Sequence, residues 1–184
     1  MSTASAQAIR YDLDPAHSVA TFKVRHLMIS NVKGEFTRVS GFVIFDPADP
    51  SNSSVEATID ATSISTRDPQ RDEHLKSADF LEVAKFPTIT FKSKEVVPAG
   101  GENFEVTGEL TIHGVTQEVA LTVEDVTAES KDPWGFLRRG ASARITISRK
   151  DFGLVWNSAL ETGGVVVGDD VHIAIDVELV RKAE

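Results

Sequence analysis

The sequence predicts an all-β protein, an antiparallel closed barrel of about eight strands with one short helix near residues 69–76. Most of the chain alternates apolar and polar residues with period two, which is typical of strands with one buried face. Short turn clusters separate these runs and favour antiparallel neighbours. One short helix cannot cover so large an apolar face. The sheet must therefore cover itself, and closing into a barrel also removes exposed edges.

Nine runs show the alternation of a strand. The clearest is 104–112, in which every second residue from Phe104 to Ile112 is apolar or glycine. Turn clusters such as Asp14-Pro15 and His113-Gly114 stand between the runs. In chain order the predicted strands are 9–13, 19–26, 36–46, 55–61, a run containing Ile89 and Phe91, 104–112, 119–123, 141–147 and 171–179.

Residues 69–76 predict the helix. Asp68 can cap its N-terminus, and Pro69 suits the first helical position because the N–H that proline lacks would have no partner there. The residues from Gln70 to Lys76 include good helix formers.

Composition narrows the class of protein. The chain has 184 residues, with 19 Lys and Arg against 28 Asp and Glu, for a formal net charge of −9. This length predicts one domain over 9–184 after a flexible N-terminal segment at 1–8. The negative charge disfavours nucleic acids and anionic membrane surfaces as partners, and the lack of cysteine excludes disulfides, thiol nucleophiles and cysteine-based metal sites. Without a signal-peptide pattern or a long apolar stretch, we expect a cytoplasmic protein with no stable membrane insertion.

The faces that point into the predicted barrel mix small residues with phenylalanines and isoleucines. Small residues around a barrel axis leave volume that protein interiors do not normally leave empty. A ligand could fill this volume, or the chain's own ten phenylalanines and two tryptophans could, and the pattern leaves both interpretations open. The small residues are Ala20, Ala57, Ala61, Gly108, Ala141 and Ala143.

Short motifs between about Tyr11 and Val180 follow one another in a specific order. They are Asp14-Pro15-Ala16-His17-Ser18, Phe22 with Val24 and His26, Gly34-Glu35-Phe36, Arg71-Asp72, His74-Leu75-Lys76-Ser77, Phe86-Pro87 with Phe91, Gly108 to Thr116, Asp151-Phe152-Gly153 and Val167-Gly168-Asp169. Their joint order resembles the YceI-like family of polyisoprenoid-binding proteins. The resemblance implies a lipocalin-like barrel whose lumen holds a long isoprenoid or a related chain, such as a quinone tail or a fatty amide. It implies no settled catalytic activity.

A long apolar ligand needs a lumen of aliphatic and aromatic side chains, with one or two polar groups near an end for its head group. For the head group we favour His26, at the end of an apolar face, with Arg71 and Asp72 on the helix. The alternative is that Arg71 and Asp72 make structural ion pairs. The candidate lining residues, each of which could also be ordinary core, are Phe22, Val24, Phe45, Ile59, Leu75, Phe80, Phe91, Phe104, Leu110, Ile145 and Trp156.

The predicted function is the binding, storage or transport of such a lipid, with no cofactor and no metal site. The five histidines lack metal-site spacing, and no nucleophile elbow, Walker A loop or dinucleotide fingerprint occurs. Two alternatives stay open. One is a lipid-modifying enzyme that uses His26 with Asp72 or Arg71 in the lumen, and the other is a barrel with a filled core whose partner is another protein. The segment 161–168 could be a lid or the contact of a possible homodimer.

Overall fold

The computed structural model describes residues 8–183, so the flexible segment predicted at 1–8 lies outside it except for Ala8. The described residues form twelve strands, one α-helix and three short 3-10 helices. In chain order these are β1 (Ile9–Leu13), β2 (Val19–His26), β3 (Ser30–Phe36), β4 (Val39–Phe45), η1 (Pro50–Asn52), β5 (Ser54–Asp60), η2 (Ala61–Ser63), β6 (Ile64–Ser65), α1 (Pro69–Lys76), β7 (Thr88–Pro98), β8 (Phe104–Ile112), β9 (Val115–Glu124), β10 (Ser130–Lys131), β11 (Phe136–Ser148), η3 (Arg149–Phe152) and β12 (Val167–Lys182).

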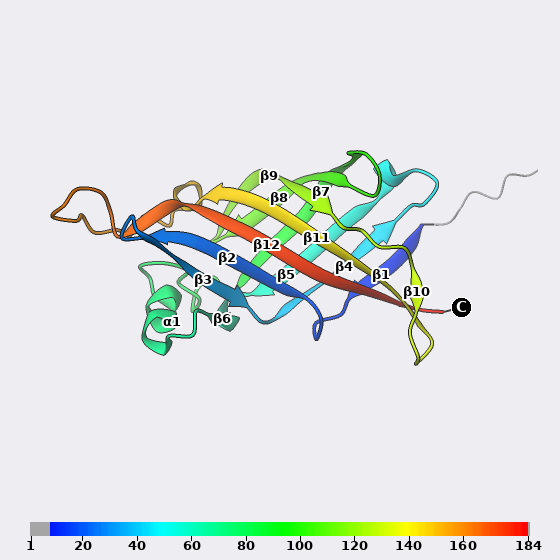
Figure 1. Ribbon diagram of the computed structural model, residues 1–184, viewed down its shortest axis with the longest axis horizontal. Coiled ribbons are helices and arrows are strands. Elements are labelled where there is room, and N and C mark those ends of the chain that lie inside the picture. The colour runs from blue at the N-terminus through cyan, green and yellow to red at the C-terminus, as the bar shows by residue number, and fades with distance from the viewer. Residues whose placement is uncertain (1–7, 184) are drawn as a thin grey trace, which may run out of the picture.

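Eight strands close into an antiparallel barrel, which confirms the predicted fold class. The ring runs through β11, β9, β8, β7, β5, β4, β1 and β12, and β12 returns to β11. The closing pair extends from Phe136 opposite Lys182 to Ser148 opposite Asp170. Figure 1 shows an elongated barrel, with α1 beside one end and β10 and the C-terminus at the other.

The strand β12 divides one of its edges between two partners. Toward the β10 end it pairs with β1 at Leu179 and Val180, and toward the α1 end it pairs with β2 between Val167 and Asp176. The strand β2 pairs in turn with β3, and β3 pairs with the short strand β6 near α1. Three strands outside the ring thus extend the wall at the α1 end.

The sequence pattern predicts no strand at β3 and wrongly joins Phe36 to the strand that follows. In the structure Phe36 ends β3, and β4 begins at Val39. The alternation in β3 is weak because Gly34 leaves room for a neighbouring ring. A Cβ at Gly34 would lie 2.3 Å from Cζ of Phe22. The strands β6 and β10, two residues each, are too short to show any period.

The helix α1 forms at the predicted position. The side chain of Asp68 accepts hydrogen bonds from the backbone N–H groups of Gln70 and Arg71, each at 3.1 Å, as an N-cap does. Leu75 packs against the core at the end of the barrel. No helix among residues 8–183 is long and apolar enough to cross a membrane.

The connection between β8 and β9 is a two-residue turn, His113-Gly114. Ile112 and Val115 pair directly across it. The φ angles of 53° at His113 and 72° at Gly114 are those of a type I′ turn, whose twist matches that of the flanking strands.

Arg149 holds the loop after β11 to the end of the barrel. Only 3% of its surface is exposed. Its guanidinium donates to four backbone carbonyls, those of Gly168 at 2.8 Å, Leu154 at 2.6 Å, Trp156 at 2.9 Å and Val167 at 3.3 Å. Several of these carbonyls lie in irregular backbone, so the buried cation satisfies acceptors that strand pairing does not reach.

Replacing Arg149 by methionine should lower the free energy of unfolding by about 3 kcal/mol, because four carbonyls lose a charged donor. The matched control is Lys150→Met. It removes the same charge from a side chain that is 52% exposed and should cost less than about 1 kcal/mol. Chemical denaturation followed by circular dichroism measures both variants. An equal loss of stability in the two would contradict this role of Arg149.

Arg138 joins three carboxylates at the β10 end. Its Nε lies 2.6 Å from Asp132, one Nη lies 2.7 Å from Asp14, and the same nitrogen also donates to Glu178. These carboxylates belong to the β10–β11 loop, the β1–β2 turn and β12, so one guanidinium ties three segments together. The bond from Arg138, followed by that from His17 at 3.0 Å, lowers the pKa of Asp14 to about 2.

Asp14 should make stability depend on pH in the acid range. Its folded pKa of about 2 lies below the ordinary value of 3.8, so its stabilisation is complete above about pH 4 and is lost as the pH falls toward 2. His17 stays charged throughout this range, because the ordinary histidine pKa of 6.5 already lies above it and Asp14 raises the pKa of His17 further. The difference in unfolding free energy between the wild type and Asp14→Asn should therefore shrink between about pH 5 and pH 2 in denaturant titrations. A difference that stays constant would show that Asp14 contributes nothing through its charge.

Candidate functional site

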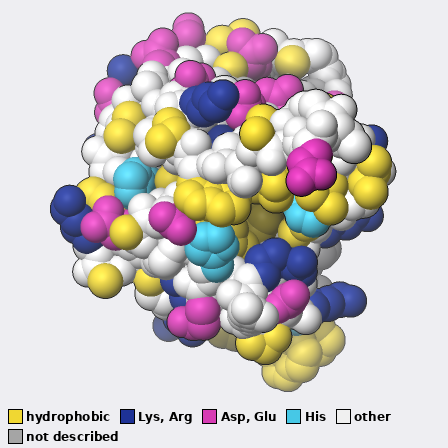
Figure 2. All heavy atoms as spheres, turned by 90° about the vertical axis from the view of Figure 1, so that its left-hand side faces the viewer, with side chains coloured by type: hydrophobic (Ala, Val, Ile, Leu, Met, Phe, Trp, Pro, Cys, Tyr) yellow, Lys and Arg dark blue, Asp and Glu magenta, His cyan; other side chains and the backbone are white. Residues whose placement is uncertain are grey.

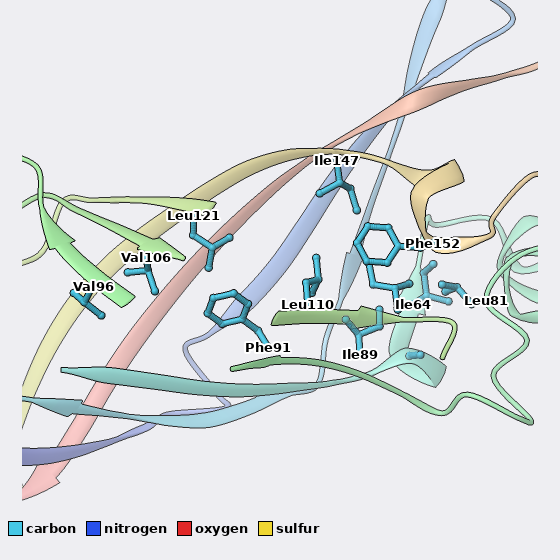
Figure 3. Packing of buried hydrophobic residues seen from close by; sticks show 12 residues of the cluster. Ile64, Leu81, Ile89, Phe91, Val96, Val106, Leu110, Leu121, Ile147 and Phe152 are labelled. Carbon is cyan, nitrogen blue, oxygen red and sulfur yellow. The ribbon is translucent and has the colours of Figure 1, made fainter. Parts of the chain in front are cut away.

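The barrel encloses a cavity of about 330 Å³. Its wall is almost wholly made of valine, isoleucine, leucine, phenylalanine and alanine side chains from strands around the ring. Figure 3 shows part of this wall, with Phe91, Leu110 and Ile147 pointing into the barrel. The volume falls in the range of about 300–1,000 Å³ that is usual for small-molecule sites.

Four small residues account for much of the open volume. Ala20, Ala57, Ala141 and Ala143 all face the cavity. Ala61, in contrast, is packed in the hydrophobic core at η2. The chain's own rings therefore do not fill the whole interior, and the interpretation with a partly empty lumen fits better.

Gly108 does not leave space in the lumen, which corrects the grouping made from the sequence. A Cβ at Gly108 would lie 2.4 Å from the carbonyl oxygen of Lys92 and 2.7 Å from Cζ of Phe91. The register between β7 and β8 shifts between Ser93 and Glu95, as at a β-bulge. Glycine is needed here for the close approach of two strands, so a larger residue would distort the wall.

Ten of the eleven predicted lining residues face the cavity, and Trp156 is the exception. The ring of Trp156 packs instead against His74 and Phe80, with centroids 5.0 and 5.3 Å away. These three rings form an aromatic cluster beside α1. The ten residues in the wall are Phe22, Val24, Phe45, Ile59, Leu75, Phe80, Phe91, Phe104, Leu110 and Ile145.

The end of the barrel next to α1 is hollowed. Figure 2 faces this end and shows hydrophobic side chains inside the hollow, with histidine and basic side chains at its rim. Leu75 of α1, Phe80 after the helix and Leu154 after η3 contribute to the cavity wall on this side. The α1 end is therefore the candidate mouth of the lumen.

The predicted head-group residues do not form a cluster on the cavity. Arg71 donates to the hydroxyl and the carbonyl of Thr66 at 2.7 and 2.9 Å. Asp72 accepts from the N–H and the hydroxyl of the same Thr66 at 2.8 and 2.6 Å. Both side chains thus fix the link between β6 and α1, a structural role that depends on hydrogen bonds to Thr66 more than on the ion pairs expected from the sequence, of which only Arg71 with Asp68 at 3.9 Å is present among the described residues. His26 lies at the end of β2 opposite Val167, and no hydrogen bond within the described chain joins it to Arg71 or Asp72.

Asp14, His17 and Glu178 bring three possible metal-ligating atoms within 4.8 Å of one another. Arg138 already donates to both carboxylates, and His17 contacts Asp14. A guanidinium between the oxygens opposes a second cation, so this group is an ion-pair network that stabilises the fold.

The sequence pattern misses two polar side chains at the other end of the lumen. Arg139 lies in the cavity wall, two residues before Ala141 and hence on the inward face of β11. Tyr11, only 1% exposed, lies next to it, with the guanidinium carbon 5.8 Å from the ring centroid. The alternation along β11 does place Arg139 on the inward face, but a search for apolar lining residues omits it because it is charged.

Comparison with known proteins agrees with this geometry. A UPF0312 protein of Vibrio cholerae serotype O1 is 40% identical over 152 residues, which are 82% of this chain and 80% of that protein. The crystal structure of Burkholderia cenocepacia BcnA matches with a TM-score of 0.79 at 26% identity and covers 90% of this chain and 98% of that chain. A polyisoprenoid binding domain from Saccharophagus degradans, 17% identical, shares the fold with a TM-score of 0.65 over 92% of this chain and 97% of that chain. Residues 11–179 match the YceI-like domain along almost the whole barrel, and the chain therefore belongs to this family.

Proposed function

We propose that the protein binds a long-chain isoprenoid or a related lipid, such as a quinone tail, inside the barrel and stores or transports it. The observation that carries this proposal is the cavity of about 330 Å³ with its almost wholly apolar wall. A hydrocarbon chain can make dispersion contacts with such a wall along its whole length, whereas water finds few hydrogen-bond partners there.

Burial of the tail would supply most of the affinity. Each methylene removed from water contributes about 0.8 kcal/mol, so several isoprene units bind firmly without a specific polar contact. The name of the Saccharophagus degradans domain supports an isoprenoid as the class of ligand.

The two other candidate functions have less support. An enzyme in the lumen needs an acid, a base or a nucleophile that faces its substrate, whereas Arg71 and Asp72 both bond to Thr66. A barrel that only binds another protein needs no free interior volume. A cytoplasmic location, the absence of catalysis and a homodimer stay predictions of the sequence.

Protein purified without detergent should carry a long-chain lipid. Organic extraction followed by mass spectrometry should yield roughly one lipid per chain, because an apolar lumen of this volume holds one extended molecule. If the extract contains no lipid and the protein does not bind an added prenyl alcohol, the proposal is wrong.

A ring at position 143 should exclude the ligand and leave the barrel folded. Ala143 faces the cavity from β11, so the phenylalanine of Ala143→Phe would occupy ligand volume. Ala120, on β9, is exposed, and Ala120→Phe is the matched control. The lipid recovered per chain should fall at least about tenfold in Ala143→Phe and stay unchanged in Ala120→Phe. If Ala143→Phe alone fails to fold, side chains already fill the lumen at this point.

A further inference from the structure

Two arginines, Arg139 and Arg149, lie among the mostly apolar residues that line the lumen, and the guanidinium of Arg149 already donates to four backbone carbonyls. Arg139 lies on the inward face of β11 that Ala141 and Ala143 share, and it lines the cavity. The side chain of Arg139 is half-buried, and a charge that is partly withdrawn from water is costly without a hydrogen-bond partner.

Among residues 8–183, the side chain of Arg139 forms no hydrogen bond and no ion pair within 4 Å, although its charge helps to lower the pKa of Glu129. Its Nε is buried without a hydrogen bond, and its guanidinium takes part in none of the ion pairs or side-chain hydrogen bonds that hold Arg138 and Arg181. Two rings lie beside it instead, with the guanidinium carbon 5.2 Å from the ring centroid of Phe45 and 5.8 Å from that of Tyr11. These cation–π contacts hold the guanidinium in place and leave its N–H donors free.

The carboxylate at this end of the lumen, Glu129, is engaged elsewhere. Arg181 donates to its two oxygens at 2.9 and 3.2 Å, and the hydroxyl of Tyr11 donates to it at 2.5 Å. The bond from Arg181 lowers the pKa of Glu129, and burial raises the pKa of Tyr11. The pair is thus a carboxylate with a neutral phenol, and Arg139 adds a positive charge that Glu129 and Arg181 do not balance.

We propose that Arg139 anchors an anionic head group, a carboxylate or a phosphate, on the lipid that the lumen holds. This inference rests on the proposed function and adds the class of head group and the orientation of the ligand. The head then lies toward the β10 end, and the tail points toward the mouth at α1. Arg139 is separated from Ile147, near α1, by roughly 26 Å at about 3.3 Å per strand residue, which leaves room for a long chain.

The guanidinium has the chemistry for this task. Its planar fork of N–H donors matches the oxygens of a carboxylate or a phosphate, and such charge-assisted bonds strengthen where water is excluded. A neutral alcohol offers one weaker acceptor. The site expected from the sequence, His26 with Arg71 and Asp72, lies outside the cavity wall, whereas Arg139 lies in it.

The test compares anionic lipids with alcohols of the same chain. Oleate against oleyl alcohol probes the carboxylate, and farnesyl monophosphate against farnesol probes the phosphate. The purified protein, freed of lipid, should bind at least one anion about tenfold more tightly than its alcohol. Arg139→Met should weaken that anion by roughly 10- to 100-fold and leave the alcohol unchanged, and Arg139→Lys should restore part of the preference.

The matched control is Arg144→Met, on the same strand. Arg144 is 63% exposed and pairs with Glu124 on the outer face, so its loss changes the net charge equally and should not change binding. In the wild type, the NMR signal of the Arg139 Nε–H should shift with the anion and not with the alcohol.

Two outcomes would overturn the anchor and leave the lipid carrier standing. One is equal affinity for anion and alcohol in the wild type, and the other is an equal loss of both in Arg139→Met. Failure of all four probes to bind the wild type would instead count against the proposed function itself.

Discussion

The hydrogen-bonded pairing of β11 with β12 closes the sheet, and every property of the interior depends on this closure. A closed ring gives each strand one face to water and one to a common axis, and it pairs most strand edges, although β9 pairs with β11 only between Thr122 and Glu124. Alanines stand among larger valines, isoleucines, leucines and phenylalanines around that axis, so the opposing walls do not meet everywhere. The number of strands fixes the circumference of the barrel, and the small side chains on its inner face leave the lumen open.

Arginines organise both ends of this barrel in different ways. Near α1, Arg149 donates to four peptide carbonyls and pairs with one carboxylate, that of Asp169, at 3.5 Å, whereas at the β10 end Arg138 binds three carboxylates. The next residue, Arg139, belongs to the opposite face of β11 because side chains alternate along a strand. Two consecutive arginines thus serve different surroundings, one in a charged network and one beside the aromatic rings of Tyr11 and Phe45.

Periodicity was sufficient to predict the barrel and most of its lining. A strand that buries one face carries apolar residues at every second position, so residues such as Phe22 and Ile145 could be assigned to the interior before their neighbours were known. The same reasoning fails where a contact depends on another strand. Gly108 is small because the backbone of β7 comes close, and the sequence of β8 alone does not show that approach.

The head-group prediction met a different difficulty. Charge and position on the helix indicate that Arg71 and Asp72 stand near an end of the barrel, but not that Thr66 already uses their hydrogen-bonding groups. Local bonds of this kind compete with ligand binding and leave no periodic trace in a sequence. Arg139 shows the converse. A charged residue is normally assigned to the outer face of a strand, and only the alternation along β11 indicates that Arg139 points inward.

The pairing of Asp12 in β1 with Val180 in β12 bears on how the barrel is made in a cell. A ribosome must reach β12 before the ring can close, since this strand follows all the other described strands and borders both β1 and β11. Contacts between residues so distant in sequence slow folding, because a long segment of chain must be ordered before they form. During that interval the apolar inner face of the nascent strands stays exposed to other chains, which makes the unclosed sheet prone to aggregation.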